Sequence, residues 1–522
     1  MKLKKKIALF LTAAMTAGLL AGCGDTGNDN QDSQSTVENS GESQTSEADN
    51  ASGEEAPAGE DPYQVRMIIA LPAASPSEGE VDRVLGKLNE LTLEKLNMTL
   101  DLQILPFAAY MEQIQLELSS KSKLDIFISV SAYGPSWVNA GYVADMGPLL
   151  EEHGQDVLNS YASPEVATAP SLNGYVYGVP VHKEISQQAS VFFRTDILEK
   201  HGLDVSGIKT IEDVDALYEK VAALEPGMWM IAPDNLGMPE LTPLDYVGGL
   251  ETYAILDPEN NTTVENFFDT EPFKKWCTYI HKWFENGWVN SGAASDTESY
   301  YSYIKSGQAF SFFSDYGHPL SVVDQQNNCG GVELTMVHLT EPLATTATSA
   351  VFCYSIGSGS EDPVKAMKML NFLMSSTEAM NLLNWGIEGE DYVVNGEGLL
   401  DFPEGKDAST VGYHLGAGWI LPNQFVCTPW ATDGADIYQK IEDYNASSII
   451  SKTMGFTFDP SPVQDQISAV SNVRSKYYKA LITGAVDPEE YIPLLLQEME
   501  DAGSAEVIAE MQRQVDAWLA EQ

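Results

Sequence analysis

The chain has 522 residues, 43% of them hydrophobic, which is ordinary for a globular protein and enough for two or three domains. Acidic residues far outnumber basic ones, with 76 Asp and Glu against 28 Lys and Arg and a formal net charge of −48. Such a charge repels phosphate backbones and anionic lipid head groups, so it excludes nucleic acid as an expected partner.

The N-terminal 22 residues have the pattern of an export signal. Four lysines within residues 2–6 are followed by an apolar run over 7–20, which is too short to span a membrane. Leu20-Ala21-Gly22-Cys23 then resembles the cleavage site of a bacterial lipoprotein signal. The resemblance implies removal of residues 1–22, lipidation of Cys23 and anchoring on the extracellular face of the cell membrane. Two or three acyl chains on one residue give a stable anchor.

Residues 23–62 are predicted to be an acidic, disordered tether. The stretch 24–62 holds eleven Asp and Glu, no Lys or Arg, and almost no large apolar side chain. It cannot bury enough surface to offset the entropy lost on ordering. No later stretch has about 18 uninterrupted apolar residues, so no further membrane span is expected.

The folded part opens with alternating strand and helix patterns. Apolar runs over 64–71 and 124–130 and a clean alternation of apolar and polar residues over 98–104 predict strands. Helical periodicity over 81–91 and 107–118 predicts helices between them. This order predicts an α/β fold with an open sheet and right-handed crossovers. Ligands of such sheets bind beyond the carboxyl ends of the strands, which directs attention to residues 131–137.

Four further segments, in order, carry a family resemblance. They are residues 141–150 (GYVADMGPLL), 173–184 (NGYVYGVPVHKE), 191–198 (VFFRTDIL) and 306–316 (SGQAFSFFSDY). Together they resemble the family 1 extracellular solute-binding proteins, the receptor subunits of ABC importers for sugars and oligosaccharides. Met146 stands where that family usually has Leu. The resemblance implies a type II periplasmic-binding-protein-like fold, in which two α/β lobes joined by two or three hinge crossovers close on a ligand.

The resemblance also implies a domain layout. Residues 63–182 are expected to form the first part of lobe 1 and 183–336 the first part of lobe 2. Residues 337–455 are expected to return to lobe 1 and the cleft, and a strand over 332–339 is expected to lead the chain back to lobe 1. Residues 456–522 are expected to be a helical region that completes the lobes. Crossings are expected near 181–184, 337–340 and 453–458. Three segments near 384–392, 418–423 and 455–460 resemble a lipoprotein branch of the family with a distinctive C-terminal region.

Aromatic side chains in predicted loops are candidates for sugar binding, because flat rings stack on the apolar faces of pyranoses while carboxylates bind the hydroxyls. The predicted ligand-binding residues are Tyr133, Trp137, Glu184, Tyr316, Trp385, Glu388 and Trp419. For the aromatics, core packing is an equal alternative, and for the two glutamates a helix cap or surface ion pair. Three tryptophans in predicted helices are assigned to the core, namely Trp276, Trp283 and Trp518.

No complete catalytic motif is present. His182-Lys183-Glu184 fits H-x-E without the second half of a zinc deaminase signature, and Ser302-x-x-Lys305 fits S-x-x-K without its companion motifs. We therefore expect a monomeric binding protein without enzyme activity, cofactor or metal, whose partners are a carbohydrate, ABC permease subunits and, through Cys23, the membrane. A surface glycoside hydrolase or lyase and a ligand sensor for a membrane kinase remain the alternatives.

The other four cysteines are Cys277, Cys329, Cys353 and Cys427. They lie far apart and form no C-x-x-C pair. Burial as small apolar side chains and pairing into disulfides are both open on spacing alone.

Overall fold

The computed structural model of the protein describes residues 61–71, 76–161, 164–233 and 237–522. The predicted signal peptide, Cys23 and nearly all of the predicted tether lie outside these described residues. The rest of the predicted architecture can be compared with the structure element by element.

Lobe 1 (residues 63–180 and 346–446) is built on a five-stranded sheet with the order β2-β1-β3-β16-β6. Its strands are β1 (Tyr63–Leu71), β2 (Met98–Pro106), β3 (Ile126–Val130), β16 (Phe352–Ser355) and β6 (Val179–Pro180). β1 pairs in parallel with β2 and with β3, and β16 pairs antiparallel with β3 and β6. The three predicted strands are confirmed. The apolar runs form β1 and β3 inside the sheet, and the alternating stretch forms the edge strand β2, which buries Met98, Leu100 and Leu102.

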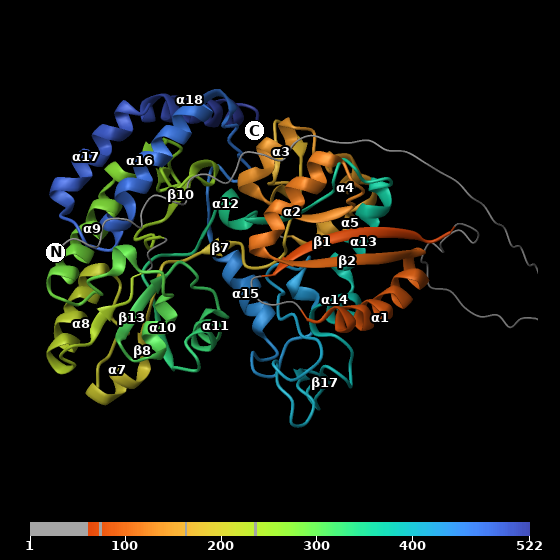
Figure 1. Ribbon diagram of the computed structural model, residues 1–522, viewed down its shortest axis with the longest axis horizontal. Coiled ribbons are helices and arrows are strands. Elements are labelled where there is room, and N and C mark those ends of the chain that lie inside the picture. The colour runs from red at the N-terminus through yellow and green to blue at the C-terminus, as the bar shows by residue number, and fades with distance from the viewer. Residues whose placement is uncertain (1–60, 72–75, 162–163, 234–236) are drawn as a thin grey trace, which may run out of the picture. The chain divides into compact units, whose positions relative to one another are not determined.

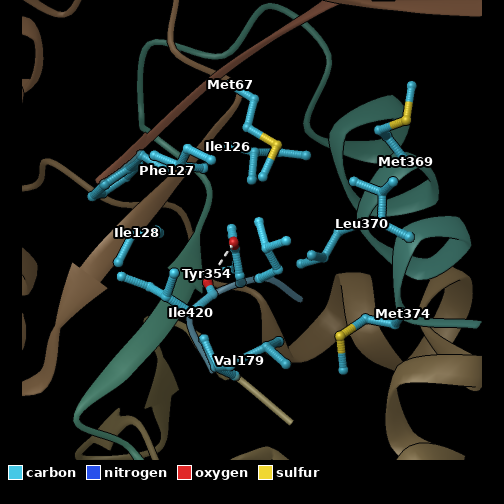
Figure 2. Packing of buried hydrophobic residues seen from close by; sticks show 14 of the residues in the cluster. Met67, Ile126, Phe127, Ile128, Val179, Tyr354, Met369, Leu370, Met374 and Ile420 are labelled. Atoms are coloured by element: carbon cyan, nitrogen blue, oxygen red, sulfur yellow. Dashed lines mark hydrogen bonds between the residues drawn. The ribbon is translucent and has the colours of Figure 1, made fainter. Parts of the chain in front are cut away.

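Helices cover this sheet. The main ones are α1 (Glu78–Leu96), α2 (Phe107–Ser120), α3 (Gly134–Asn139), α4 (Gly147–His153), α5 (Gln155–Ser160), α13 (Pro363–Ser375) and α14 (Thr377–Trp385). Figure 2 shows side chains of β1, β3 and β16 packed with those of α13, including Met67, Tyr354 and Leu370. In this core the Tyr354 hydroxyl donates a hydrogen bond of 2.8 Å to the Ile420 carbonyl oxygen, so the buried phenol is satisfied.

Lobe 2 (residues 190–338 and 451–522) has a four-stranded sheet with the order β14-β8-β13-β9. The strands are β14 (Leu334–His338), β8 (Ser190–Arg194), β13 (Ala309–Ser314) and β9 (Trp229–Ile231), and a second sheet is formed by β10 (Leu244–Tyr246), β11 (Tyr253–Leu256) and β12 (Glu265–Asn266). The expectation that residues 332–339 return to lobe 1 is wrong, because β14 pairs along its whole length with β8. An apolar run shows that a strand is buried but not which sheet receives it.

Helices of lobe 2 include α7 (Thr195–His201), α8 (Ile211–Leu224), α9 (Glu271–Glu285), α10 (Tyr300–Lys305) and α11 (Ser321–Asn328). The C-terminal helices are α16 (Gln464–Ile482), α17 (Pro488–Asp501) and α18 (Ser504–Leu519). α16 and α17 lie against α9, and α18 packs on α16 and α17 (Figure 1). Their apolar faces enter the lobe 2 core beside Trp276 and Trp283. The C-terminal region therefore completes lobe 2.

Three short crossing strands join the lobes. They are β7 (Ser186–Gln187), β15 (Leu343–Ala344) and β19 (Ile449–Ile450), which form one sheet in the order β19-β15-β7. The structure thus has three crossovers, each a few residues from the position expected for it. Two further helices flank this hinge sheet, α12 (Thr346–Ser349) and α15 (Ile437–Ala446).

Candidate functional site

The lobe 1 side of the site is an aromatic surface at the hinge end of the sheet. Phe107 directly follows the last residue of β2, and Phe352 begins the antiparallel β16, so both lie at the carboxyl edge of the parallel strands. Their rings stack with centroids 5.7 Å apart, and Trp419 lies 5.8 Å from Phe352 and 6.4 Å from Phe107. All three side chains are half-buried. The predicted residue Trp419 is thus part of an aromatic group whose other members were not predicted.

The loop after β3 presents a second aromatic side chain at the same edge. Tyr133 is 47% exposed, whereas Trp137 is only 2% exposed. Their rings stack 5.7 Å apart, and Trp137 in turn meets Phe127 edge-on at 5.7 Å. Trp137 therefore supports Tyr133 from the core, and Tyr133 is the ring that a ligand can reach.

A cavity lies beside this loop. It contains about 700 Å³ of empty space, part of it open to solvent. Lobe 1 lines it with residues from 131–135 and with Tyr177, lobe 2 with residues 245–250, and the C-terminal region with residues from 453–460. The position beyond the carboxyl end of β3 agrees with the rule for open α/β sheets.

A buried carboxyl group, that of Asp245, is among the groups that line this cavity. Asp245 is 5% exposed and accepts hydrogen bonds of 2.6 Å from both the Ser451 and the Thr453 hydroxyls. Burial raises the pKa of Asp245, and the two hydroxyl donors partly offset that rise. The carboxyl group is thus held in place by lobe 2 and by the chain just behind the third crossing.

Lobe 2 contributes an exposed tyrosine and an acidic lip. Tyr316 follows β13 at the hinge end of the lobe 2 sheet and is 52% exposed. Beside it, the Glu240 backbone N–H donates a hydrogen bond of 3.0 Å to Asp315 Oδ1. Burial and the neighbouring negative charges of Asp315 and Asp245 raise the pKa of Glu240 well above its usual range. The shift favours the protonated, uncharged form of Glu240, so this carboxyl group can donate a hydrogen bond to a neutral ligand.

Neighbouring chain segments approach closely behind Tyr316, and Gly317 permits this because it has no side chain. A Cβ atom at Gly317 would lie 2.5 Å from Ser190 Oγ and 2.8 Å from the Gln188 carbonyl oxygen. The close packing of these backbones fixes where the Tyr316 ring leaves the sheet.

Glu184 lies buried at the first crossing. Lys183 Nζ donates to Glu184 Oε1 at 2.6 Å and to the Glu184 carbonyl oxygen at 3.1 Å. Burial opposes ionisation of Glu184, but the positive charge of Lys183 and its hydrogen bond outweigh burial and lower the pKa of the carboxyl group. Glu184 is therefore a buried member of an ion pair at the hinge, and its carboxylate does not face solvent where a ligand could bind it.

A set of buried polar atoms on lobe 2 adjoins Glu184. His318 Nδ1, Ser321 Oγ and Gln325 Oε1 have no hydrogen-bond partner within the described part of the chain. Ser321 and Gln325 are separated by one turn of α11, so this helix turns a polar face inward. Buried polar groups in native proteins are nearly always paired, so these atoms indicate a place for solvent or ligand.

Two predicted residues lie elsewhere. Trp385 ends α14, is 8% exposed and packs 5.2 Å from His414 and 5.4 Å from Trp430. Phe402 completes this aromatic loop cluster, 4.4 Å from Trp430. Glu388 is exposed in the adjoining loop. None of the seven predicted ligand-binding residues lines the described cavity itself, although Tyr133 and Trp137 lie in the chain segment beside it.

The four described cysteines, Cys277, Cys329, Cys353 and Cys427, are free and buried. The open choice between burial and disulfides is thereby decided for these residues. No helix among the described residues is both long and apolar enough to cross a membrane.

Comparison with known proteins assigns the chain to a family. The family model described as "Bacterial extracellular solute-binding protein" matches residues 84–380, and a "Domain of unknown function (DUF3502)" matches residues 452–520. A "Carbohydrate ABC transporter substrate-binding protein" of Streptococcus pneumoniae serotype 4 is 26% identical over 482 residues, covering 87% of this chain and 91% of that protein.

Solved structures share the fold. The N-glycan transport solute-binding protein NgtS from Streptococcus pneumoniae has a TM-score of 0.78 at 23% identity, covering 88% of this chain and 99% of that chain. A solute-binding protein from Bifidobacterium longum infantis, described as binding HMO, has a TM-score of 0.63 at 14% identity, covering 88% and 100%. The two-lobed fold expected from the sequence is confirmed, and the C-terminal region has its own family model. The chain belongs to the family of bacterial extracellular solute-binding proteins.

Proposed function

We propose that the protein captures a neutral oligosaccharide between its lobes and delivers it to the permease of an ABC transporter. The observation that carries this proposal is the exposure of aromatic rings at the hinge ends of both sheets, Tyr133 and Trp419 on lobe 1 and Tyr316 on lobe 2. Rings at such edges stack on the apolar faces of sugars, and the neighbouring polar groups bind hydroxyls. The formal net charge of −48 disfavours anionic ligands such as uronic and sialic acids.

The relatives indicate which sugars to test. NgtS is described in complex with Man1GlcNAc and with Man5GlcNAc. We therefore propose oligosaccharides of mannose and N-acetylglucosamine as the first candidates for this chain. Capture needs no covalent step, since the ligand favours the closed state only by contacting both lobes.

Isothermal titration calorimetry against neutral mannose and N-acetylglucosamine oligosaccharides tests the proposal directly. We expect saturable binding to a neutral glycan and much weaker binding to a hexuronate oligosaccharide of the same length. The absence of binding to every sugar in the panel would reject it. Mass spectrometry of the ligand after incubation separates the hydrolase alternative, because a binding protein returns the oligosaccharide intact.

We further propose that Cys23 is lipidated and holds the protein at the outer face of the cell membrane. The sequence pattern of residues 2–23 supports this. In a bacterial host, Cys23→Ser is expected to move the protein from the membrane fraction to the medium, or to leave it unprocessed. Full membrane retention of Cys23→Ser would contradict lipidation at this residue.

A further inference from the structure

The C-terminal region begins just behind the third crossing strand with a segment, residues 453–461, that we call the bridging segment. This segment is firmly fixed to lobe 2. Phe458 is 3% exposed in the lobe 2 core, and Phe456 meets the ring of Trp518 edge-on at 6.0 Å. The Asp459 N–H donates to Gln514 Oε1 at 2.9 Å, and Gln514 Nε2 donates back to the Asp459 carbonyl oxygen at 2.9 Å.

The same segment also reaches lobe 1. Asn139, the exposed last residue of α3, donates from Nδ2 to Asp459 Oδ1 at 3.4 Å and to Ser461 Oγ at 3.3 Å. Both distances are at the long end for a hydrogen bond, so each bond is weak. The Asp459 carboxylate is nevertheless held in position, because Oδ1 also accepts from the Ser461 N–H at 3.0 Å and its hydroxyl at 2.6 Å.

A second contact between the bridging segment and lobe 1 lies at the cavity. Tyr177 and Thr457 both line it. Burial raises the pKa of the Tyr177 phenol, and the neighbouring Thr457 hydroxyl partly offsets the rise. Neither hydroxyl makes a hydrogen bond of good geometry within the part of the chain that the structure describes. Tyr177 and Thr457 are therefore neighbours that no strong hydrogen bond joins.

The hinge sheet restricts the relative orientation of the lobes only weakly, because each of its three strands is only two residues long. Contacts outside the hinge must then decide the relative position of the lobes. Beside the hinge strands, the Gly455 N–H donates a hydrogen bond of 2.8 Å to Thr346 Oγ1 of α12, which joins the segment to lobe 1 at the hinge. Away from the hinge, the contacts of the bridging segment are strong on the lobe 2 side and weak at α3 of lobe 1, which is the arrangement expected of a releasable contact.

We propose that the region matched as a domain of unknown function is a conformational clasp: anchored on lobe 2 through α18, it holds lobe 1 through Asn139 and Asp459 and so sets the resting separation of the lobes. A weak contact suits this role, because a several-fold change in population requires only a small difference in free energy. Release of the Asn139–Asp459 contact lets the lobes rotate about the hinge without disturbing either core.

The test uses the ligand-free full chain, so its result does not depend on whether a sugar binds. In a Cys23→Ser background, Ser119→Cys on α2 and Ser206→Cys in lobe 2 place spin labels at two exposed positions. The four native cysteines are buried and will not compete for the label. Pulsed dipolar spectroscopy then reports the distribution of distances between the lobes.

Asn139→Asp places a carboxylate against Asp459. We expect the population of the main peak in the distance distribution to fall at least twofold relative to the parent protein. The exchange Asn139→Asp with Asp459→Asn re-creates the donor and acceptor in reversed order and is expected to restore the peak. Asn159→Asp makes the same charge change at an exposed helical position of lobe 1 and should leave the distribution unchanged.

The outcomes separate cleanly. An unchanged distribution in Asn139→Asp overturns the clasp. A shift that the exchange does not restore, or that Asn159→Asp reproduces, overturns the assignment to this pair. Thermal melting of each variant checks folding, and since the contact is weak, we expect melting temperatures close to that of the parent.

Discussion

The exposed phenol ring of Tyr133 lies nearly parallel to the buried indole of Trp137, with planes 18° apart and centroids separated by 5.7 Å. The buried ring limits the orientations open to the exposed one, so less conformational entropy is lost when a ligand stacks on Tyr133. The two residues thus have different tasks, one in contact with ligand and one in support.

We therefore predict that Tyr133→Ala weakens oligosaccharide binding by about 1 kcal/mol, roughly fivefold in Kd, without lowering the melting temperature. Tyr133→Phe keeps the ring and should bind almost as well as the parent. Trp137→Ala leaves a large cavity in the core and should cost about 3–5 kcal/mol of unfolding free energy. Calorimetric titration and urea unfolding measure the two quantities, and an unchanged Kd for Tyr133→Ala would remove that ring from the site.

The two candidate tryptophans Trp419 and Trp385 give an internal comparison. Trp419 is half-buried among aromatic rings at the sheet edge, and we predict that Trp419→Ala weakens binding by about 1 kcal/mol. Trp385 is enclosed in the aromatic loop cluster with His414 and Trp430. Trp385→Ala should therefore destabilise the fold by about 3 kcal/mol and leave the Kd unchanged. A reversed result, with affinity lost only in Trp385→Ala, would move the site to the loop cluster.

Much of the fold could be predicted because several signals agree locally. Apolar runs and one alternating stretch located β1, β2 and β3, three of the five strands of the lobe 1 sheet. The hinge strands could not be located as closely. Ser186–Gln187 and Leu343–Ala344 are too short to show any alternation, and only their pairing with distant segments makes them strands.

The site was predictable by residue type but not by exposure. Tyr133 and Trp137 are one helical turn apart, and nothing in the sequence tells which of them faces solvent. Phe107 and Phe352 were missed because the stack between them forms only when β16 inserts into a sheet begun far earlier in the chain. The one available signal was the position of Phe107 directly after a predicted strand, at the edge where ligands bind.

Protonation of His182 should make stability depend on pH. Its imidazole is packed between the rings of Tyr161 at 4.7 Å and Phe425 at 4.6 Å. Burial lowers the pKa of His182 to about 4, although a hydrogen bond with Asn423 opposes the shift. The unfolded chain takes up the proton near pH 6.5 and the folded protein does not, so stability falls as the pH drops from about 6.5 towards 4.

When the pH is lowered from 7 to 5, the titration of His182 should reduce the unfolding free energy of the parent protein by about 2 kcal/mol. His182→Gln removes the titrating group, so its loss over the same interval should be smaller by that amount. His414, with its pKa also lowered by burial to about 4, remains in both proteins and cancels in the comparison. Urea unfolding at the two pH values measures the difference, and equal losses in parent and variant would contradict a buried neutral His182.

The free cysteines give a test of both cores at once. Cys277 and Cys353 are 1% and 0% exposed, one in each lobe, and burial raises the pKa of their thiols far above the usual value. Burial also raises the pKa of Cys329 to about 11 and that of Cys427 to about 12. Because only the exposed thiolate reacts quickly, Ellman's reagent should find almost no reactive thiol in the native Cys23→Ser protein. The same protein in urea, without reductant, should release four equivalents. Fewer than four would reveal a disulfide, and rapid native reaction would show that one of the cores opens far more readily than its packing indicates.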